Sequence, residues 1–202
     1  SNSSAASDVY KRQVLHCLFF HLWTKGERDE FLWNTACDIM VEYTIDTMEK
    51  KSTKRILSYI RKTTYERLKK EHIVIAPGAL YAWLYKQYAE IEAEEITDID
   101  DIANTKDKNE LALLAREFYT DDHAFWPEEK NDNAMPLSSS EAQKQWQKIS
   151  RQTRMEKKHS KDSKSEGEQV MMRELSAKRS RRSYKEFLRR FAVLREEVHA
   201  CL

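Results

Sequence analysis

The chain has 202 residues, of which 34% are charged and 40% hydrophobic, and its formal net charge is +1. Only three Gly and three Pro interrupt it, and the abundance of Lys, Glu, Leu and Ala predicts a mainly α protein. No apolar run approaches the roughly 18 residues of a membrane span, and no signal peptide is visible. Because Cys17, Cys37 and Cys201 show no paired spacing, we expect reduced thiols and a cytoplasmic protein rather than a disulfide scaffold or a membrane protein.

Positive charge is concentrated in residues 141–190, which hold 16 Lys and Arg against 7 Asp and Glu. Such asymmetry raises the question of a nucleic-acid partner. However, the aromatic residues of the stretch, Tyr184, Phe187 and Phe191, recur at the spacing of a helix core rather than of a stacking surface. A Lys- and Ser-rich segment is usually only solvated, so we expect no nucleic-acid binding.

The first 13 residues, SNSSAASDVYKRQ, are expected to be foreign to the protein. The run from Asp8 to Gln13 resembles a translated transposase-type sequencing adapter, although an ordinary polar tail would have a similar composition. Residues 1–13 are therefore left out of the fold expectations. Cys201 and Leu202 are compatible with the reverse adapter, so we expect a fragment cut at both ends.

Two amphipathic helices are expected between Val14 and Lys50. The first is almost wholly apolar, ends near Trp23 ahead of Gly26, and carries His16 and His21. Histidines five residues apart lie about 140° apart around a straight helix, so they face one point only if the helix stops between them. We expect His16 to be a metal ligand, with His21 at the mouth of the site or a third ligand if the helix unwinds there.

The second helix is expected over residues 30–50, and it carries Asp38 and Glu42 one turn apart on one flank. Asp38 follows His16 by 22 residues, enough for a turn and an antiparallel return. Histidine and carboxylate facing each other across two helices are typical of a zinc hydrolase. The alternative is that Asp38 caps a helix or forms a salt bridge within the helical pair.

The later elements are expected to be helices separated by polar segments. We expect helices at residues 52–71, 77–92, 109–118, 138–158, 168–177 and 183–199. In the first of these, Ile56 and Tyr59 are expected to belong to the buried side, and the Lys and Arg residues to a solvated face. Residues 127–140 have the composition of a linker, and residues 157–167 form a low-complexity segment.

A polar and aromatic cluster, YTDDHAFW, spans residues 119–126. On a loop, His123 could donate a hydrogen bond to a developing oxyanion while the adjacent Asp122 fixes its tautomer. The alternative is a helix cap formed by Asp121, with the aromatic rings packed against the core.

Three stretches carry a resemblance to a known family: LHCLFFHLW with RDEFLWNTACDIMVEYTID, then YTDDHAFW, then RRSYKEFLRRFAVLREEVHA. They resemble bacterial metal-dependent peptidases in which a metallopeptidase domain precedes a VWA-like domain. Members of that family carry H-E-x-x-H-x-x-x-x-H on the first helix. The resemblance implies that His16 and His21 are the second and third motif histidines, and that the first histidine and the glutamate fall on Arg12 and Gln13.

The resemblance also implies a ligand set and supporting residues. Asp38 matches the aspartate of the family's WNxAxD motif. The implied metal ligands are His16, His21 and Asp38, the implied supporting residues are Asn34, Glu42 and Asp122, and His123 is the implied oxyanion donor.

The implied fold is a compact, helical, zincin-like metallopeptidase domain. The expected organisation is a tail at 1–13, the metallopeptidase domain at 14–130, a charged linker with one helix at 131–167, and helices at 168–202 that lead to a missing VWA-like domain. The implied function is zinc-dependent hydrolysis of peptide bonds in a protein or peptide substrate. This chain is expected to be inactive because Arg12 and Gln13 stand where the motif has its first histidine and its glutamate. The alternative is a non-catalytic scaffold that works with a MoxR-type ATPase, the partner that the resemblance implies.

Overall fold

The computed structural model describes residues 2–50, 53–93, 111–118, 140–159 and 164–177. Its helices are α1 (Asn2–Leu18), the 3-10 turn η1 (His21–Trp23), α2 (Glu30–Asp46), α3 (Tyr59–Lys70), α4 (Pro77–Ala93), a short helix at 111–118, α6 (Ser140–His159) and a helix at 166–177. Within these ranges there is no β-strand, which confirms the prediction of a mainly α protein. No helix in the described ranges has the length and apolar character needed to span a bilayer.

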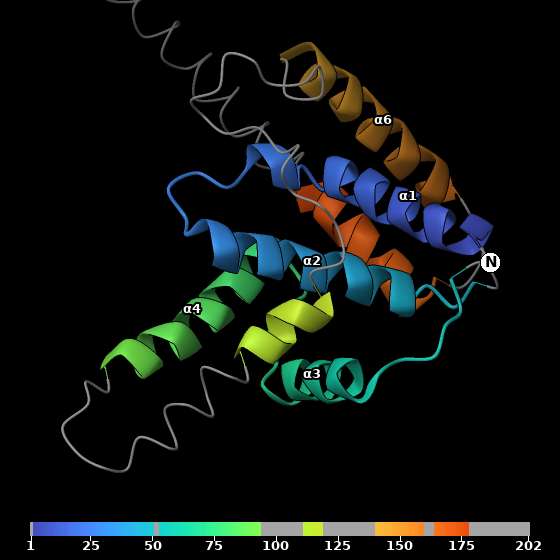
Figure 1. The fold of residues 1–202 in the computed structure, drawn as a ribbon. Helices are drawn as coiled ribbons and strands as arrows, with labels where there is room; N and C mark the ends of the chain where they lie inside the picture. The colour runs from blue at the N-terminus through green and yellow to red at the C-terminus, as the bar shows by residue number, and fades with distance from the viewer. Residues whose placement is uncertain (1, 51–52, 94–110, 119–139, 160–163, 178–202) are drawn as a thin grey trace, which may run out of the picture.

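Helix α2 is the centre of the fold, and it is buried almost continuously from Leu32 to Ile45. In Figure 1, α1 and α6 lie on one side of α2, and α3 and α4 lie on the other. Its N-cap is Asp29, whose carboxylate accepts a hydrogen bond from the Leu32 amide at 2.8 Å. That bond satisfies one of the amides that a helix start leaves without a backbone partner. Because α2 has neighbours on both sides, polar residues on it must find partners inside the protein.

Helix α1 ends earlier than the sequence predicts, at Leu18 instead of near Trp23. The cause is Phe20, which has φ 58° and ψ 26° in the left-handed region although it is not a glycine. Residues other than glycine are sterically strained in this region. Burial of Phe20, which is 8% exposed, offsets this strain. The chain therefore turns sharply between the two histidines and continues as η1.

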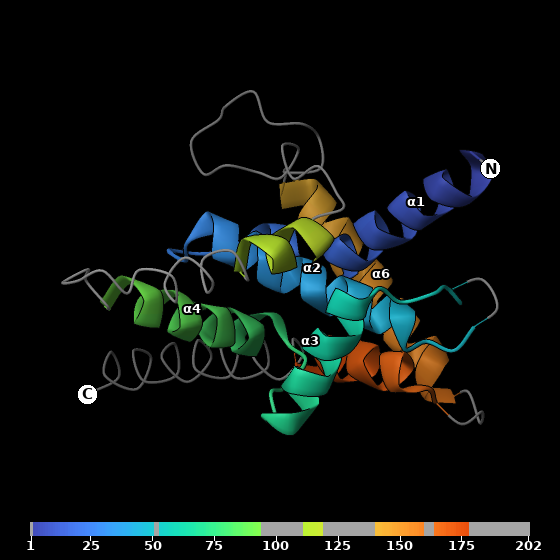
Figure 2. The ribbon, with the colours of Figure 1, turned by 60° about the horizontal axis from the view of Figure 1, so that its bottom comes forward.

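Helix α2 ends at Asp46 rather than at Lys50 because another part of the chain packs against its last turn. The Gly167 amide donates to the Thr47 carbonyl oxygen at 3.0 Å. A Cβ added to Gly167 would lie 2.2 Å from the Thr44 carbonyl oxygen, so the absence of a side chain permits this approach. Figure 2 shows the helix at 166–177 beside the C-terminal end of α2.

The third helix begins at Tyr59, seven residues later than predicted, with Ser58 as its N-cap. The Ser58 hydroxyl accepts from the Arg61 amide at 3.1 Å. The predicted buried side is also wrong at its start, because Ile56 and Tyr59 are 98% and 80% exposed. The buried residues of α3 are Arg61, Thr64, Tyr65 and Leu68, of which Leu68 alone was predicted from the sequence.

The last two described helices pack on the same hydrophobic core as α1 and α2. From α6, the Ser150 hydroxyl donates to the Leu18 carbonyl oxygen at 3.1 Å, at the end of α1. The helix at 166–177 contributes Val170, Met171 and Leu175 to the core. The predicted domain boundaries near residues 130 and 167 stay predictions, and the predicted helix at 183–199 lies outside the described residues.

Candidate metal centre and the adjoining arginine network

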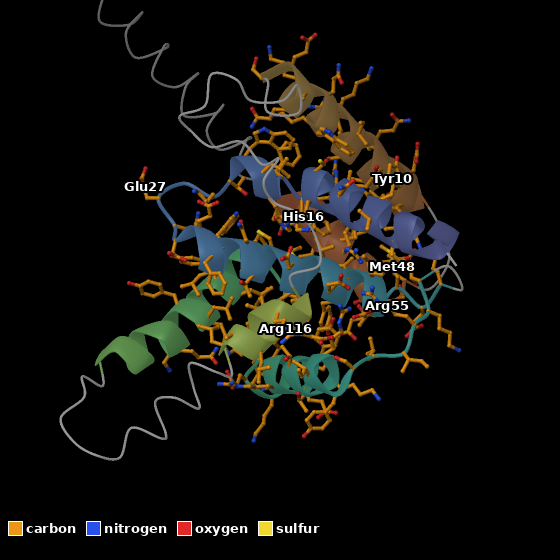
Figure 3. The ribbon with its side chains drawn as sticks, viewed as in Figure 1. Tyr10, His16, Glu27, Met48, Arg55 and Arg116 are labelled. Atoms are coloured by element: carbon orange, nitrogen blue, oxygen red, sulfur yellow. The ribbon has the colours of Figure 1, made fainter. Side chains whose placement is uncertain are left out.

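The candidate site lies between α1 and α2, where His16 faces Asp38. His16 Nε2 is 3.3 Å from Asp38 Oδ1, and each residue is 2% exposed. Figure 3 shows His16 inside the protein, on the side of α1 that faces α2. Burial of an imidazole and a carboxylate is costly unless each has a polar neighbour, and here each meets the other.

His21 joins this pair through the opposite edge of the His16 ring. The Nδ1 atoms of His16 and His21 are 3.0 Å apart, and His21 is fully buried. This contact depends on the turn at Phe20, because a straight helix would separate the two rings by about 140°. The condition stated from the sequence, that the helix must stop between the histidines, is therefore met without a glycine.

The surroundings of His21 hold its backbone and ring in place. Trp33 Nε1 donates to the His21 carbonyl oxygen at 3.3 Å. The Trp33 ring also meets the imidazole edge-on, with centroids 6.5 Å apart, and Phe19 lies 5.5 Å away on the same measure. Packing of the His21 ring against Phe19, in the turn before η1, and against Trp33 of α2 thus fixes the orientation of His21.

The residues present fit a zinc ion only in part. Two ligands that are each 2.0 to 2.1 Å from one tetrahedral zinc lie about 3.3 Å apart, and the His16 to Asp38 distance is 3.3 Å. His21 contacts the other ring nitrogen of His16, so the three side chains do not converge on one point. Among the described residues no group of three or more His, Cys, Asp or Glu could hold a metal ion.

Arg12 and Gln13, where the resemblance places the missing histidine and glutamate, lie one turn before His16. Arg12 Nη1 is 3.6 Å from Glu42 Oε1, and the Arg12 side chain is only 11% exposed. Gln13 is exposed. Position 12 therefore faces α2, at the carboxylate one turn beyond Asp38.

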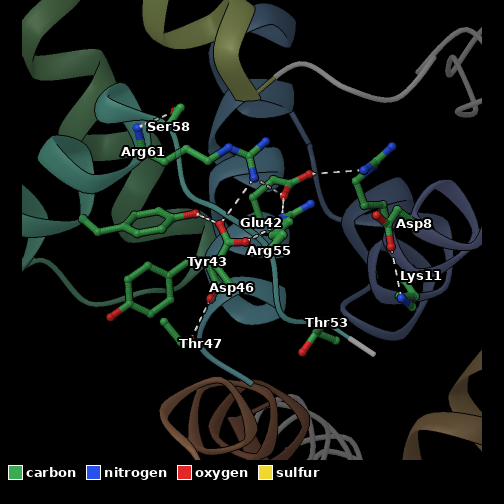
Figure 4. A network of polar contacts seen from close by, with 12 residues as sticks. Asp8, Lys11, Glu42, Tyr43, Asp46, Thr47, Thr53, Arg55, Ser58 and Arg61 are labelled. Atoms are coloured by element: carbon green, nitrogen blue, oxygen red, sulfur yellow. Dashed lines mark hydrogen bonds and ion pairs between the residues drawn. The ribbon is translucent and has the colours of Figure 1, made fainter. Parts of the chain in front are cut away.

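Beyond Glu42 the site continues into a buried network of arginines and carboxylates, drawn in Figure 4. Arg61 Nη1 lies 2.6 Å from Glu42 Oε2 and 3.3 Å from Asp46 Oδ2. Arg55 pairs with the same two carboxylates, at 2.5 Å from Nε to Asp46 Oδ1 and also in direct contact with Glu42. Arg61 Nε reaches Glu117 Oε1 at 3.1 Å. The network thus joins α2, α3, the segment before α3 and the helix at 111–118.

Burial governs the ionisation of this network. It raises the pKa of Asp46 despite hydrogen bonds from Tyr65 and Arg61, and it lowers the pKa of Arg55 to about 10. Charged groups taken out of water need close partners of opposite sign. Arg55 accordingly contacts two carboxylates and Arg61 contacts three. Arg12 contacts the buried carboxylate of Glu42.

Tyr65 donates its hydroxyl to Asp46 Oδ2 at 2.6 Å, and this contact predicts alkaline sensitivity. Burial and the Asp46 carboxylate raise the pKa of Tyr65, so the folded chain keeps the proton at a pH where an unfolded tyrosine, with a pKa of about 10, loses it. Stabilisation from this proton is complete below about pH 10 and is lost as the pH rises, by up to about 1.4 kcal/mol per pH unit. We expect the free energy of unfolding, measured in urea from pH 9 to 11, to fall less steeply in Tyr65→Phe.

Tyr59→Phe is the control, because Tyr59 is 80% exposed on the same helix, and it should keep the wild-type slope. Tyr43, whose pKa is also raised by burial, should leave part of the slope in Tyr65→Phe. Equal slopes in Tyr65→Phe and the wild type would contradict the assignment.

The structure places the residues singled out from the sequence as follows. It brings together His16, His21 and Asp38, and it holds Glu42 one turn away among arginines. Asn34 lies partly buried on α2, one turn before Asp38. Asp122 and His123 lie outside the described residues, so their roles stay predictions.

Arg55 and Arg61 belong to the buried network, whereas the sequence predicts a solvated face for the Lys and Arg residues of this segment. A signal was available, because Asp38, Glu42 and Asp46 recur every four residues on a helix whose other residues are mostly apolar. On a helix that is covered on both sides, carboxylates in such a row are buried together, and buried carboxylates require cations nearby. The basic helix that follows in the chain was the obvious source of those cations.

Comparison with known proteins adds no relative: no family model, no curated protein and no solved structure matches the chain.

Proposed function

We propose that this fold is the metal-binding core of a zinc-dependent peptidase, and that the chain as written is inactive. The observation that carries the proposal is the buried pair of His16 and Asp38, on two different helices, 3.3 Å apart. That separation equals the spacing of about 3.3 Å between two ligands of one tetrahedral ion. It also agrees with the family that the sequence resembles, in which His16 matches a histidine of the first-helix motif and Asp38 matches the aspartate of WNxAxD.

The orientation of Arg12 supports the proposal further. Arg12 and His16 are one helical turn apart, and both point from α1 toward the carboxylates of α2. A histidine at position 12 would therefore approach the same side of α2 as His16 does. The chain lacks this ligand, and glutamine at position 13 cannot accept a proton as glutamate does.

The proposed roles follow from these positions. Zinc held in such a site lowers the pKa of a coordinated water to about 7. His16 and Asp38 would bind the ion, and a glutamate at position 13 would serve as general base toward the peptide substrate. His123 is proposed as an oxyanion donor, and its loss should slow turnover without loss of metal binding.

Restoring the missing pair tests the proposal. We expect Arg12→His with Gln13→Glu in the full chain to bind one zinc ion per molecule, because it completes the ligand set. The original chain should bind zinc weakly and substoichiometrically. Metal analysis after gel filtration gives the stoichiometry, and hydrolysis of an unfolded protein substrate gives the activity.

Arg12→Gln with Gln13→Glu is the matched control, since it also removes the guanidinium beside Glu42 but adds no imidazole. It should bind no more zinc than the original chain. If the restored variant and this control retain equal amounts of zinc, the proposal is wrong.

A second function, a non-catalytic scaffold for a MoxR-type ATPase, is favoured by a different observation. Glu42 and Asp46 are held by Arg55 and Arg61, which makes this half of the interior a structural network rather than a site for a cation. The scaffold predicts that the original chain captures the purified ATPase, and that the restored variant binds it equally well without peptidase activity.

A further inference from the structure

We infer that one exposed face of α6 is a docking surface for a nucleic-acid duplex, which it holds through the phosphates without readout of the base sequence. The inference goes beyond the proposed function and does not rest on it. It departs from the expectation of no nucleic-acid binding, which rests on the Lys- and Ser-rich segment and on aromatic spacing, not on the faces of α6.

The surface is a stripe of basic side chains along α6 that contains no carboxylate. At about 100° per residue, positions 144, 148, 151 and 158 fall within about 80° of one another around the helix axis. All four side chains are exposed, and together they are called the basic stripe: Lys144, Lys148, Arg151 and Lys158. The two carboxylates of α6, Glu141 and Glu156, fall outside this arc.

The charges of the basic stripe are not neutralised within the part of the chain that the structure describes. None of its four residues makes an ion pair there. By contrast Lys157, on another face of α6, is paired with Glu168 at 2.8 Å. Like charges one turn apart on a helix repel each other, so binding of an external anion would relieve the repulsion along the stripe.

The opposite face of α6 is used for packing and is closed to a partner. Trp146 packs against the hydrophobic core, and the buried Ser150 hydroxyl donates to the Leu18 carbonyl oxygen. Figure 1 shows α6 at the outside of the fold, beside α1. A helix that lies in a bilayer surface inserts an apolar face, whereas the large apolar side chains that α6 exposes are Ile149 and Met155, at 42% and 47%. The basic stripe therefore fits a polyanion in solution better than a bilayer.

Two features of the basic stripe favour a duplex over a single strand. From Lys144 to Lys158 the stripe is about 21 Å long, at about 1.5 Å per residue. That length faces about six phosphates of one duplex strand, at about 3.4 Å each. Single strands are held largely by stacking of their bases on aromatic rings, and the aromatic ring of α6, Trp146, lies on the packed side.

Binding of a short fluorescent DNA duplex of mixed sequence to the full chain, followed by anisotropy, tests the inference. Four phosphate contacts predict that log K falls against log salt with a slope of about −3.6, and that the dissociation constant is about 10⁻⁴ M at physiological salt. In Lys148→Gln with Arg151→Gln the slope should fall to about −1.8, and binding at about 0.05 M salt should weaken by at least about 10-fold.

Lys62→Gln with Lys70→Gln is the matched control, because both lysines are exposed on α3 and the change in net charge is the same. It should bind the duplex within about twofold of the original chain, since charges remote from the duplex are screened by salt. Circular dichroism should show both double variants folded, because the substituted side chains are exposed.

Absence of duplex binding by the original chain at low salt would overturn the inference. Equal weakening in the two double variants would assign the effect to net charge, and no weakening in either would place the duplex elsewhere on the chain; each result would remove the role of α6. Binding of single-stranded DNA, phosphatidylserine vesicles or poly-glutamate as tight as that of the duplex would overturn the choice of partner.

Discussion

Gly167→Ala is expected to lower the free energy of unfolding by about 3 kcal/mol, at the upper end for an added methyl group in a packed interior. A Cβ at this position would lie 2.2 Å from the Thr44 carbonyl oxygen, 2.8 Å from the Met48 amide nitrogen and 3.0 Å from the Thr47 carbonyl carbon. All three are backbone atoms at the end of α2, so no side chain can rotate away. The strain can be relieved only if the helix at 166–177 moves off α2. Urea denaturation gives the change in stability, and hydrogen exchange at the Gly167 amide shows whether its bond to Thr47 is lost.

Gly78→Ala is the matched control, because a Cβ there meets no atom within 4 Å. Alanine in the first turns of α4 should be neutral or stabilise the chain by about 0.5 to 1 kcal/mol. Equal effects of the two substitutions would show that Gly167 does not closely approach α2.

Arg61→Met is expected to destabilise the chain by about 3 kcal/mol, the lower end of the cost of breaking a buried ion pair, because Arg55 still pairs with the two buried carboxylates. Arg61 contacts Glu42, Asp46 and Glu117, and the side chains of Glu42 and Asp46 are fully buried. Methionine keeps much of the length and apolar stem of arginine, so the loss reports the charge. The measurement is the free energy of unfolding at pH 7.

Arg67→Met, on the same helix, is the control. Arg67 pairs with Glu71, but both side chains are substantially exposed, at 43% and 38%. An exposed pair of this kind contributes about 0 to 1 kcal/mol. If the two substitutions cost the same, the buried network does not hold α3 against α2.

Helices with a strong apolar pattern could be predicted from the sequence, and their ends could not. The bounds of α4 were predicted to within one residue, since Pro77 marks its start. The ends of α1 and α2 were wrong because each is set by tertiary contact: the left-handed Phe20 in one case, and the approach of Gly167 in the other. Gly167 lies far from the end of α2 in sequence, and a left-handed conformation is rare for phenylalanine, so local propensity gave no sign of either helix end.

The rotation of α3 shows a second limit of the apolar pattern. The pattern favoured burial of Tyr59, yet Tyr59 is exposed and Arg61 is buried. Pairing of Arg61 with the α2 carboxylates decided the orientation, because leaving buried carboxylates without cations costs more than exposing one tyrosine ring. In the candidate site, the meeting of His16 and Asp38 followed from their spacing, whereas the contact with His21 required the turn at Phe20.

The left-handed Phe20 makes the contact between His16 and His21 depend on the tertiary fold. Nothing in residues 14–23 alone favours a break in the helix at a phenylalanine, so a detached segment would tend to stay helical there and keep its imidazoles apart. The two rings meet only while the Phe20 ring stays buried and α2 binds the η1 backbone. The contact between the two imidazoles thus depends on the assembled fold. Any event that loosens the aromatic packing around Trp33 would separate His16 from His21 before the helices themselves unwind.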